Sequence, residues 1–286
     1  MSGLATGPGG LPGEAHRIRF YGHELINQRL AIDGIEFGLV CGPGHDSDKQ
    51  NLVLVHGLGC RWTFWRHNLD AFLADYNIFL FDLPWSSYAP CTFKELDDLL
   101  VWTGKVFMQA AVDSPVVVAH SYGAAVVLNL AMRGGAGFAR RLVLSSIIWP
   151  QIPTKDNWVE RRRHLIGNFE NFLYRGVTAG LRADADPVIA QDILAKVIKL
   201  CDRDSVLGYW DLLFDRHHRI ETGFNIPALV IVGCEDDIVP VADSYQLCER
   251  LDSFEYLCLE DSQHFPMIER KEDFHAFIQR YSSATA

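Results

Sequence analysis

Three kinds of reactive side chain occur at separate points of this 286-residue chain, each shortly after a run of apolar residues. They are Ser121, the acidic cluster at residues 235–237 (EDD) and His264. A histidine can take the proton from a serine hydroxyl while a carboxylate orients the imidazole, so this set is suited to nucleophilic catalysis. The carboxyl ends of parallel strands meet at one edge of an open sheet. We therefore predict that the three groups meet at such an edge.

Ser121 lies between two apolar segments of different character. The β-branched run at residues 116–118 predicts a buried strand, and the apolar residues at 124–132 predict a helix. Ala119 and Gly123 flank the serine at two residues on either side. Small side chains suit a tight strand-to-helix turn, because bulky ones would clash where the backbone reverses. Alone, the stretch is equally consistent with a serine in an ordinary turn.

A glycine-containing stretch at residues 56–59 (HGLG) follows the apolar run 52–55. Acyl transfer needs backbone N–H donors aimed at a developing oxyanion, and glycines let the backbone come close to a substrate. A glycine-rich turn after a strand is also common in folds with alternating strands and helices. The stretch alone therefore does not define a site.

Together, these stretches resemble the α/β-hydrolase family, whose nucleophile lies in a G-x-S-x-G turn and whose triad has the chain order serine, acid, histidine. The sequence departs from the family at Ala119, which replaces the first glycine, and at Gln263, where a glycine usually precedes the histidine. The resemblance covers the chain from about Gln28 onward. It implies an α/β fold with a mostly parallel central sheet, helices on both faces and an inserted all-helical cap.

The resemblance also implies a role for each reactive group. The expected nucleophile, acid and base are Ser121, Asp236 and His264, and the expected oxyanion donors are the backbone amides of Leu58 and Tyr122. In the family pattern the acid follows a glycine by three residues and precedes a proline by four, which places it at Asp236, between Gly233 and Pro240. Glu235 and Asp237 are adjacent competitors, and capping of the following helix is an alternative role for members of this cluster.

Apolar strand-like runs alternate with helical patterns over most of the chain. The strand-like runs lie at residues 52–55, 78–81, 116–118, 141–147, 228–232 and 254–259, and the helical patterns at 64–76, 92–112, 124–132, 241–251 and 266–281. Uniformly apolar strands alternating with helices predict a parallel sheet covered on both faces. Residues 28–40 alternate loosely around Asp33 and Gly34, which predicts an antiparallel hairpin ahead of that sheet.

This alternation stops between residues 149 and 222, where only helical patterns occur. We predict a helical cap at 149–222 on a core formed by 16–148 and 223–286, after a disordered leader at 1–15 that is rich in Gly and Pro. Aromatic residues of the cap, including Trp149 and Trp210, are candidate walls of an apolar substrate pocket. For each of them, packing of the cap onto the core is the alternative.

The stretch at residues 82–88 (DLPWSSY) lacks the glycines that relatives tend to have there. It should lie beside the strand that precedes the HGLG stretch. Trp85 would then either narrow the substrate pocket or pack beneath the cap, and the sequence does not choose between the two.

The composition limits the partners and the compartment. A formal net charge of −10 argues against nucleic acid or an anionic membrane as a partner, and no apolar run reaches the length of a membrane-spanning helix. The seven cysteines are scattered, without paired spacing. Those in or beside strand-like runs (Cys41, Cys60, Cys234 and Cys258) are expected to be free, buried thiols in a reducing cytoplasm. The oligomeric state is left open.

No cluster of Cys, His and Asp has metal-site spacing, and the sequence contains no phosphate loop or cofactor fingerprint, so we expect neither a metal nor a cofactor. The expected activity is hydrolysis of a small or medium ester or thioester with an apolar acyl part, through an acyl-enzyme. Two alternatives remain: a carbon–carbon bond hydrolase or lyase with the same triad, and a non-hydrolytic ligand receptor on this fold.

Overall fold

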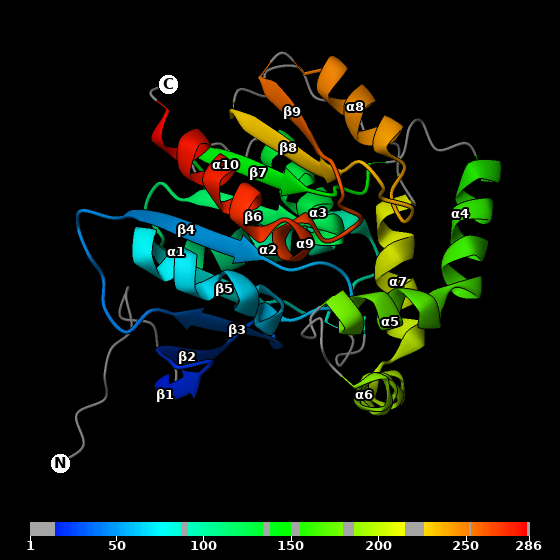
Figure 1. Ribbon diagram of the computed structural model, residues 1–286, viewed down its shortest axis with the longest axis horizontal. Helices are drawn as coiled ribbons and strands as arrows, with labels where there is room; N and C mark the ends of the chain where they lie inside the picture. Colours follow the sequence, from blue (N-terminus) through cyan, green and yellow to red (C-terminus); the bar gives the residue numbers. More distant parts are fainter. Residues whose placement is uncertain are drawn as a thin grey trace.

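The computed structural model describes residues 15–86, 91–133, 138–149, 155–179, 186–214, 226–251 and 253–284. In these residues nine strands form one sheet in the order β1-β2-β3-β5-β4-β6-β7-β8-β9 (Figure 1). The strands are β1 (Ala15–Phe20), β2 (His23–Ile32), β3 (Ile35–Cys41), β4 (Gln50–Val55), β5 (Tyr76–Asp82), β6 (Val116–His120), β7 (Arg141–Ser145), β8 (Ala228–Gly233) and β9 (Phe254–Leu259).

The sheet is antiparallel at one side and parallel elsewhere. β1, β2, β3 and β5 pair antiparallel in that order, and β5, β4, β6, β7, β8 and β9 pair parallel. The predicted turn at Asp33 and Gly34 joins β2 to β3, and both residues have the positive φ that such tight turns require. A second hairpin, which was not predicted, joins β1 to β2 through Tyr21 and Gly22.

Two hydrophobic clusters cover the two faces of the sheet. Val53 and Val55 of β4 belong to the cluster under α2 (Leu96–Ala110) and α3 (Ser121–Met132). Leu52 and Leu54 point to the other face. The cluster on that face includes residues of the 3₁₀ helix η1 (Trp62–Asn68), α1 (Leu69–Asp75), α9 (Pro266–Glu269) and α10 (Lys271–Ser283). This alternation follows from the two-residue period of a strand. The predicted mostly parallel sheet with helices on both faces is confirmed.

Several helix boundaries differ from the prediction, and three of the differences have a clear structural description. The segment predicted as a helix from residue 64 starts as η1 and becomes α-helical at Leu69. The helix predicted from about residue 92 starts at Leu96 and ends at Ala110, where Ala111 adopts a left-handed conformation (φ 49°) that stops it. The predicted last helix is divided into α9 and α10, because Arg270 leaves the helical conformation (φ −129°, ψ 50°).

The described residues between β7 and β8 form four helices: α4 (Lys155–Gly167), α5 (Phe169–Ala179), α6 (Pro187–Leu200) and α7 (Arg203–Phe214). Figure 1 shows them beyond the carboxyl ends of the parallel strands. Arg162 of α4 donates to Asp211 of α7 (Nε–Oδ1 2.8 Å), and the Ser205 hydroxyl of α7 accepts from the Cys91 amide (3.1 Å). These contacts join the helices to one another and to the segment before α2. Assignment of residues 149–222 as a separate cap domain remains a prediction.

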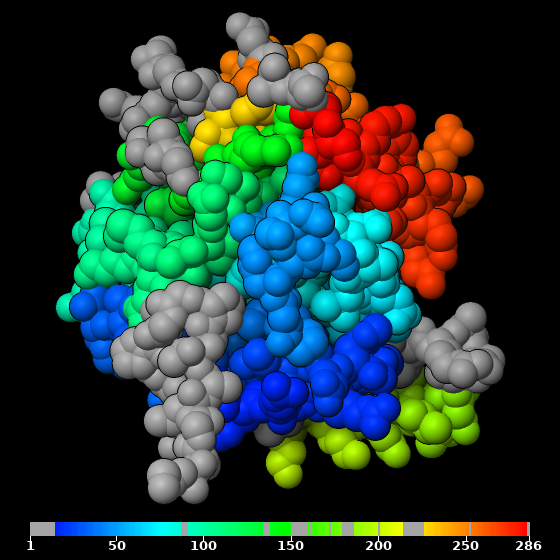
Figure 2. Space-filling model, turned by 90° about the vertical axis from the view of Figure 1, so that its left-hand side faces the viewer, coloured from blue at the N-terminus to red at the C-terminus, as the bar shows by residue number. Residues whose placement is uncertain are grey.

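Figure 2 views the molecule from the end away from α4, with the first strands in blue and α10 in red on its surface. α8 (Val241–Glu249) covers β8 and β9. Most of the predicted leader, residues 1–14, lies outside the described residues, and Ala15 already belongs to β1. Within the described chain no helix is both long and apolar enough to cross a bilayer.

The prediction that all four strand-associated cysteines are free thiols is wrong for two of them. Cys234 and Cys258 form a disulfide, with their Cα atoms 5.3 Å apart. Parallel pairing of β8 with β9 causes this proximity: Val232 lies opposite Cys258, and the Cys234 amide donates to the Leu259 carbonyl. The 24-residue separation in sequence gives no sign of that register. Cys41 and Cys60 remain thiols, and burial raises their pKa values to about 11 and about 12.

Candidate active site

Ser121 is the first residue of α3 and follows β6 directly. Its φ is +52°, in the left-handed region that non-glycine residues rarely adopt. A Cβ atom on Gly123 would lie 2.3 Å from the backbone oxygen of His56 and 2.9 Å from Cγ1 of Val55. The helix therefore starts in direct backbone contact with the end of β4. This close approach explains the small residue two positions after the serine.

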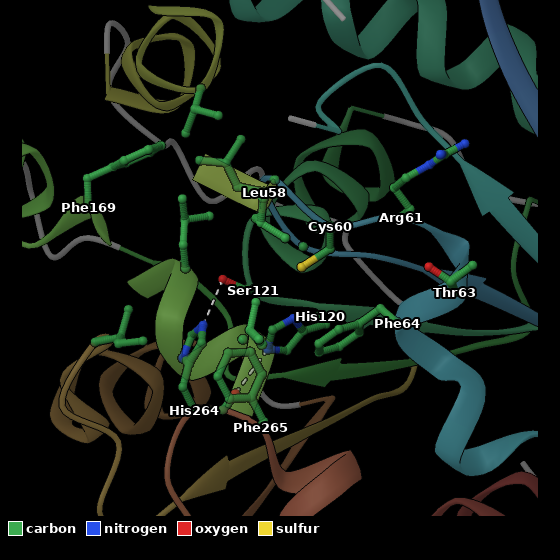
Figure 3. Close-up of a pocket in the computed structure, with 18 of the residues that line it drawn as sticks. Leu58, Cys60, Arg61, Thr63, Phe64, His120, Ser121, Phe169, His264 and Phe265 are labelled. Atoms are coloured by element: carbon green, nitrogen blue, oxygen red, sulfur yellow. Dashed lines mark hydrogen bonds between the residues drawn. The ribbon is translucent and has the colours of Figure 1, made fainter. Parts of the chain in front are cut away.

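The structure brings the three widely separated side chains into a hydrogen-bonded chain. The Ser121 hydroxyl and Nε2 of His264 are 3.1 Å apart, and Nδ1 of His264 lies 2.9 Å from Oδ2 of Asp236 (Figure 3 shows the Ser121–His264 bond). With Nδ1–H donating to the carboxylate, Nε2 is left to accept from the serine hydroxyl. All three residues are buried. This geometry allows His264 to act on the serine proton without a bridging water.

The Asp236 carboxylate is held ionised at its buried position. Burial by itself raises the pKa of this carboxyl, but the charge of His264, its hydrogen bond and the amides of Val239 and Ile238 together lower the pKa below its ordinary value. Oδ1 accepts from both amides, at 2.9 Å from Val239 and 3.0 Å from Ile238. The carboxylate is thus available to balance a positive charge on His264.

The neighbouring acids have other partners. Asp237 forms an ion pair with Arg175 of α5. Glu235 is exposed, and its backbone amide donates to the Ser262 carbonyl at 2.9 Å. In the structure Asp236 alone of the three acids forms a hydrogen bond with His264. The difference arises because successive residues of this turn point in different directions, which residue order does not reveal.

The loop that carries His264 is fixed by contacts that the sequence did not predict. A Cβ atom on Gly233 would lie 2.0 Å from the Gln263 carbonyl oxygen, so the end of β8 and this loop touch backbone to backbone. Glu269 accepts from the Gln263 amide (2.6 Å) and from the Ser262 hydroxyl (3.0 Å). Glu269 thereby connects the loop to α9. No Ser or Thr lies three residues before Glu269, as in an S/T-x-x-E capping signal, so the role of Glu269 could not be identified from residue spacing.

His56 shapes the HGLG loop from within. Its Nδ1 and the Gly57 carbonyl oxygen are 2.8 Å apart, and its Nε2 accepts from the Leu83 amide at 2.9 Å. Complete burial lowers the pKa of His56, so the ring stays neutral with its proton on Nδ1. The loop is thus tied to the end of β5 and presents Leu58 to the cavity beside Ser121. The oxyanion role of the Leu58 and Tyr122 amides remains a prediction.

A cavity of about 450 Å³ lies over Ser121 and His264 and is lined mainly by apolar side chains. Helices α4–α7 contribute Leu165, Phe169, Leu173, Val177, Ile193, Val197, Val206 and Trp210, and the core contributes Leu58, Phe64, Ile148, Ile238 and Phe265. Figure 3 shows Phe169 and Leu58 on opposite sides of the space above Ser121. Two arginines, Arg61 and Arg66, also line it, and Arg61 is paired with Asp82 (2.7 Å). The hydroxyl of Ser121 therefore faces a largely apolar space.

Of the three tryptophans predicted to form the pocket, Trp210 lines this cavity and the other two do not. Trp85 is completely buried, packs on Tyr122 (ring centroids 5.6 Å apart) and donates from its indole N–H to the His56 carbonyl at 3.0 Å. Trp149, just after β7, is buried in the hydrophobic cluster shared with α2 and α3. Both predictions of a pocket wall are corrected: each indole is turned into the core.

No group of three or more His, Cys, Asp or Glu side chains suited to a metal ion occurs in the parts of the chain that the structure describes. His120, which directly precedes Ser121 in the sequence, lines the cavity together with Ser121 and His264. The hydrogen-bonded reactive groups at this cavity are Ser121, His264 and the Asp236 carboxylate behind His264.

The model of the alpha/beta hydrolase family matches residues 52–277. The chain belongs to this family. The segment matched includes Ser121, Asp236 and His264, so the family predicted from the sequence is confirmed, and the protein is an α/β hydrolase.

Individual relatives are distant. The chain is 24% identical over 255 residues to the pimeloyl-[acyl-carrier protein] methyl ester esterase of Vibrio atlanticus (strain LGP32), covering 82% of this chain and 93% of that protein. The enol-lactonase from Burkholderia xenovorans LB400 has the same fold, with a TM-score of 0.68, 18% identity and coverage of 90% and 100%. So has the 2-hydroxy-6-oxo-6-phenylhexa-2,4-dienoate hydrolase from Rhodococcus sp. strain RHA1, with a TM-score of 0.70, 15% identity and coverage of 92% and 100%.

Replacement of Gly123 by alanine tests the close approach of α3 to β4. The added Cβ would lie 2.3 Å from a backbone oxygen, so the serine turn must move. We expect a loss of about 1–3 kcal/mol in unfolding free energy and slower labelling of Ser121 by a fluorophosphonate. Gly104→Ala in α2 is the control, because its Cβ would meet only Leu130 at 3.4 Å. Equal stability of the two variants would contradict the close approach.

Acid should destabilise the protein from about pH 6.5 downward. Burial lowers the pKa of His120 from 6.5 to about 3, so between these values the unfolded chain binds a proton that the folded chain does not. The unfolding free energy then falls as pH falls, by about 1.4 kcal/mol per pH unit for one such group. Urea unfolding between pH 7 and pH 5 should show a shallower slope in His120→Gln. The exposed His164 provides the control variant, His164→Gln, and an unchanged slope in His120→Gln would refute the prediction.

Proposed function

We propose that the protein is a serine hydrolase that cleaves a small or medium ester through a Ser121–His264–Asp236 triad and an acyl-enzyme intermediate. The observation that carries this proposal is the buried hydrogen-bonded chain, 3.1 Å and 2.9 Å per link, beside a largely apolar cavity. A serine is a weak nucleophile by itself and needs a base at this distance. A purely structural serine would not need a histidine backed by an ionised carboxylate.

In the proposed reaction the Ser121 oxygen attacks the acyl carbon while His264 takes its proton. The Asp236 carboxylate stabilises the resulting imidazolium. The amides of Leu58 and Tyr122 hold the oxyanion that forms on the carbonyl oxygen. When the intermediate collapses, His264 gives the proton to the departing alcohol, and the acyl group remains on Ser121. Water, activated by His264, then attacks this ester and restores the serine.

The cavity supports the proposed substrate class. Its walls are mainly apolar and suit an apolar acyl chain, although Arg61, Thr63 and Arg66 also line it. The curated relative is named for the methyl ester of an acyl group attached to a carrier protein, which supports an ester of an acyl chain as the substrate here. A thioester is the neighbouring possibility within the same mechanism. We propose a small-molecule ester with an apolar acyl part.

Carbon–carbon bond hydrolysis is the second candidate within the same triad. It is supported by the structural neighbour named as a hydrolase of 2-hydroxy-6-oxo-6-phenylhexa-2,4-dienoate, a compound whose name contains a ketone and a carboxylate but no ester. Turnover of a simple ester and no turnover of such a keto acid would favour the esterase. A receptor without hydrolytic activity is the third candidate. In that case wild type would show no turnover, and Ser121→Ala would bind the ligand as well as wild type does.

The proposal also includes the partners and the cellular location of the enzyme. The net charge of −10 supports neither nucleic acid nor an anionic membrane surface as a partner. We retain a cytoplasmic location because Cys41 and Cys60 are thiols. The disulfide between Cys234 and Cys258 weighs against it, because disulfides persist mainly in oxidising compartments.

Substitution of the triad tests the reaction. Ser121→Ala and His264→Ala should each lower kcat for a p-nitrophenyl ester by ~10⁴-fold or more, because triad members act as a unit, and Asp236→Asn should lose somewhat less. A fluorophosphonate should label wild type and fail to label Ser121→Ala. Thermal unfolding serves as the control for folding. Labelling that persists in Ser121→Ala would mean that another residue is the nucleophile.

Substitution of two tryptophans tests the cavity. Trp210 lines it and Trp149 is buried in the core, so the pair is matched in residue type and differs in position. Trp210→Leu should change the relative kcat/KM across a series from acetyl to octanoyl esters, since one methylene in an apolar pocket is worth about 1–3 kcal/mol. Trp149→Leu should lower the melting temperature and leave the chain-length profile unchanged. The same profile in both variants would exclude Trp210 as a wall of the acyl site.

A further inference from the structure

His120, the residue before the serine, connects the two reacting groups through a side chain that the proposed mechanism does not use. Its Nε2 lies 3.0 Å from the backbone carbonyl oxygen of His264, across 144 residues of sequence. A carbonyl only accepts, so Nε2 carries the proton and donates it to this bond. Ser121 and His264 are therefore connected in two ways. Their side chains form one hydrogen bond, and the residue before Ser121, His120, forms a second one to the backbone of His264.

The other ring nitrogen of His120 has no hydrogen-bond partner among the described residues. It faces Gly57, where a Cβ atom would lie 2.8 Å from Nδ1. The residue is 1% exposed, and burial lowers its pKa to about 3. A buried polar atom without a partner is unfavourable. A residue needed only to fill this space would be better replaced by an apolar side chain.

The ring is also held firmly in place. Phe64 stacks on it with centroids 5.1 Å apart and an interplanar angle of 23°, and Phe265 packs at 5.6 Å. Figure 3 shows the His120 ring between Phe64 and the pair formed by Ser121 and His264. The rings of His120 and His264 are 4.9 Å apart. A second cation so close would oppose the proton that His264 receives in the proposed reaction, and the neutral His120 ring avoids this repulsion.

We propose that His120 is a positioning residue, which holds the carbonyl of His264 through Nε2–H and so keeps the imidazole of His264 in line with the Ser121 hydroxyl. This inference rests on the proposed serine hydrolase function. The link matters because His264 lies in a loop between β9 and α9, where small movements would lengthen the 3.1 Å contact to Ser121. Misplacement of a catalytic group by about 1 Å can cost about a hundredfold in rate.

Two substitutions separate the hydrogen bond from the shape of the ring. His120→Phe keeps a flat ring against Phe64 and removes the donor. His120→Gln has an amide N–H that can take the place of Nε2–H. We expect kcat for a p-nitrophenyl ester to fall ~10–100-fold in His120→Phe, with KM within about twofold of wild type, and to be largely restored in His120→Gln. If the phenyl ring does not fit and the variant fails to fold, His120→Leu takes its place.

Asn68→Leu is the matched control. The Asn68 side chain also donates a buried hydrogen bond to a backbone carbonyl just after the base, that of Met267, at 2.8 Å. Its loss should lower the melting temperature with little change in kcat. If kcat falls in proportion to the melting temperature in all three variants (His120→Phe, His120→Gln and Asn68→Leu), the role of His120 is merely structural. Wild-type kcat in a folded His120→Phe would also overturn the proposal.

The rate of Ser121 labelling by a fluorophosphonate separates this inference from the proposed function. Labelling needs the Ser121–His264 pair and does not need the correct ester. If wild type is labelled but hydrolyses no ester, the esterase proposal fails, and slower labelling of His120→Phe than of His120→Gln still supports positioning. Equal labelling rates in those two variants overturn it. Wild type that is neither labelled nor active overturns both proposals.

Discussion

The backbone turn at Ser121 is the constraint on which the rest of the site depends. A positive φ at a serine costs of the order of 1–3 kcal/mol and persists only where the surroundings impose it. Here β6 is completely buried on one side of the turn, and α3 is buried along almost its whole length on the other. The start of α3 also touches the end of β4 at Gly123, where a side chain would clash with the His56 backbone. This conformation of the turn places the Ser121 hydroxyl at the floor of the cavity.

The charges around Ser121 are the second feature on which the site depends. Asp236 is buried, and an ionised carboxylate in such a position needs partners. Two backbone amides and His264 supply them and lower its pKa. His56 and His120 surround the same site with neutral rings, because burial lowers their pKa values. The site therefore contains one buried negative charge next to the one histidine proposed to become positive, and the two neighbouring histidine rings add no further positive charge.

The helices between β7 and β8 determine what can reach the hydroxyl. They contribute most of the apolar wall of the cavity, and Arg175 of α5 pairs with Asp237 beside the acid of the triad. An exposed ion pair of this kind contributes little to stability. Its position nevertheless connects the wall of the cavity to the turn that carries Asp236. The core supplies the reactive groups, and these helices supply the apolar surroundings.

Features that depend on local pattern could be predicted from the sequence. Apolar runs around residues 52–55, 116–118 and 228–232 identified strands, and the small residues around Ser121 identified a turn, because strand burial and tight turns restrict side chains at neighbouring positions. The order serine, acid, histidine then identified the family. The tertiary structure was needed to show which acid faces His264, that Trp85 and Trp149 point into the core while Trp210 faces the cavity, and that Cys234 meets Cys258. It also decided that His120 reaches the backbone of His264. These outcomes depend on strand register and on the direction in which each side chain packs, and both are set by contacts between residues far apart in the chain.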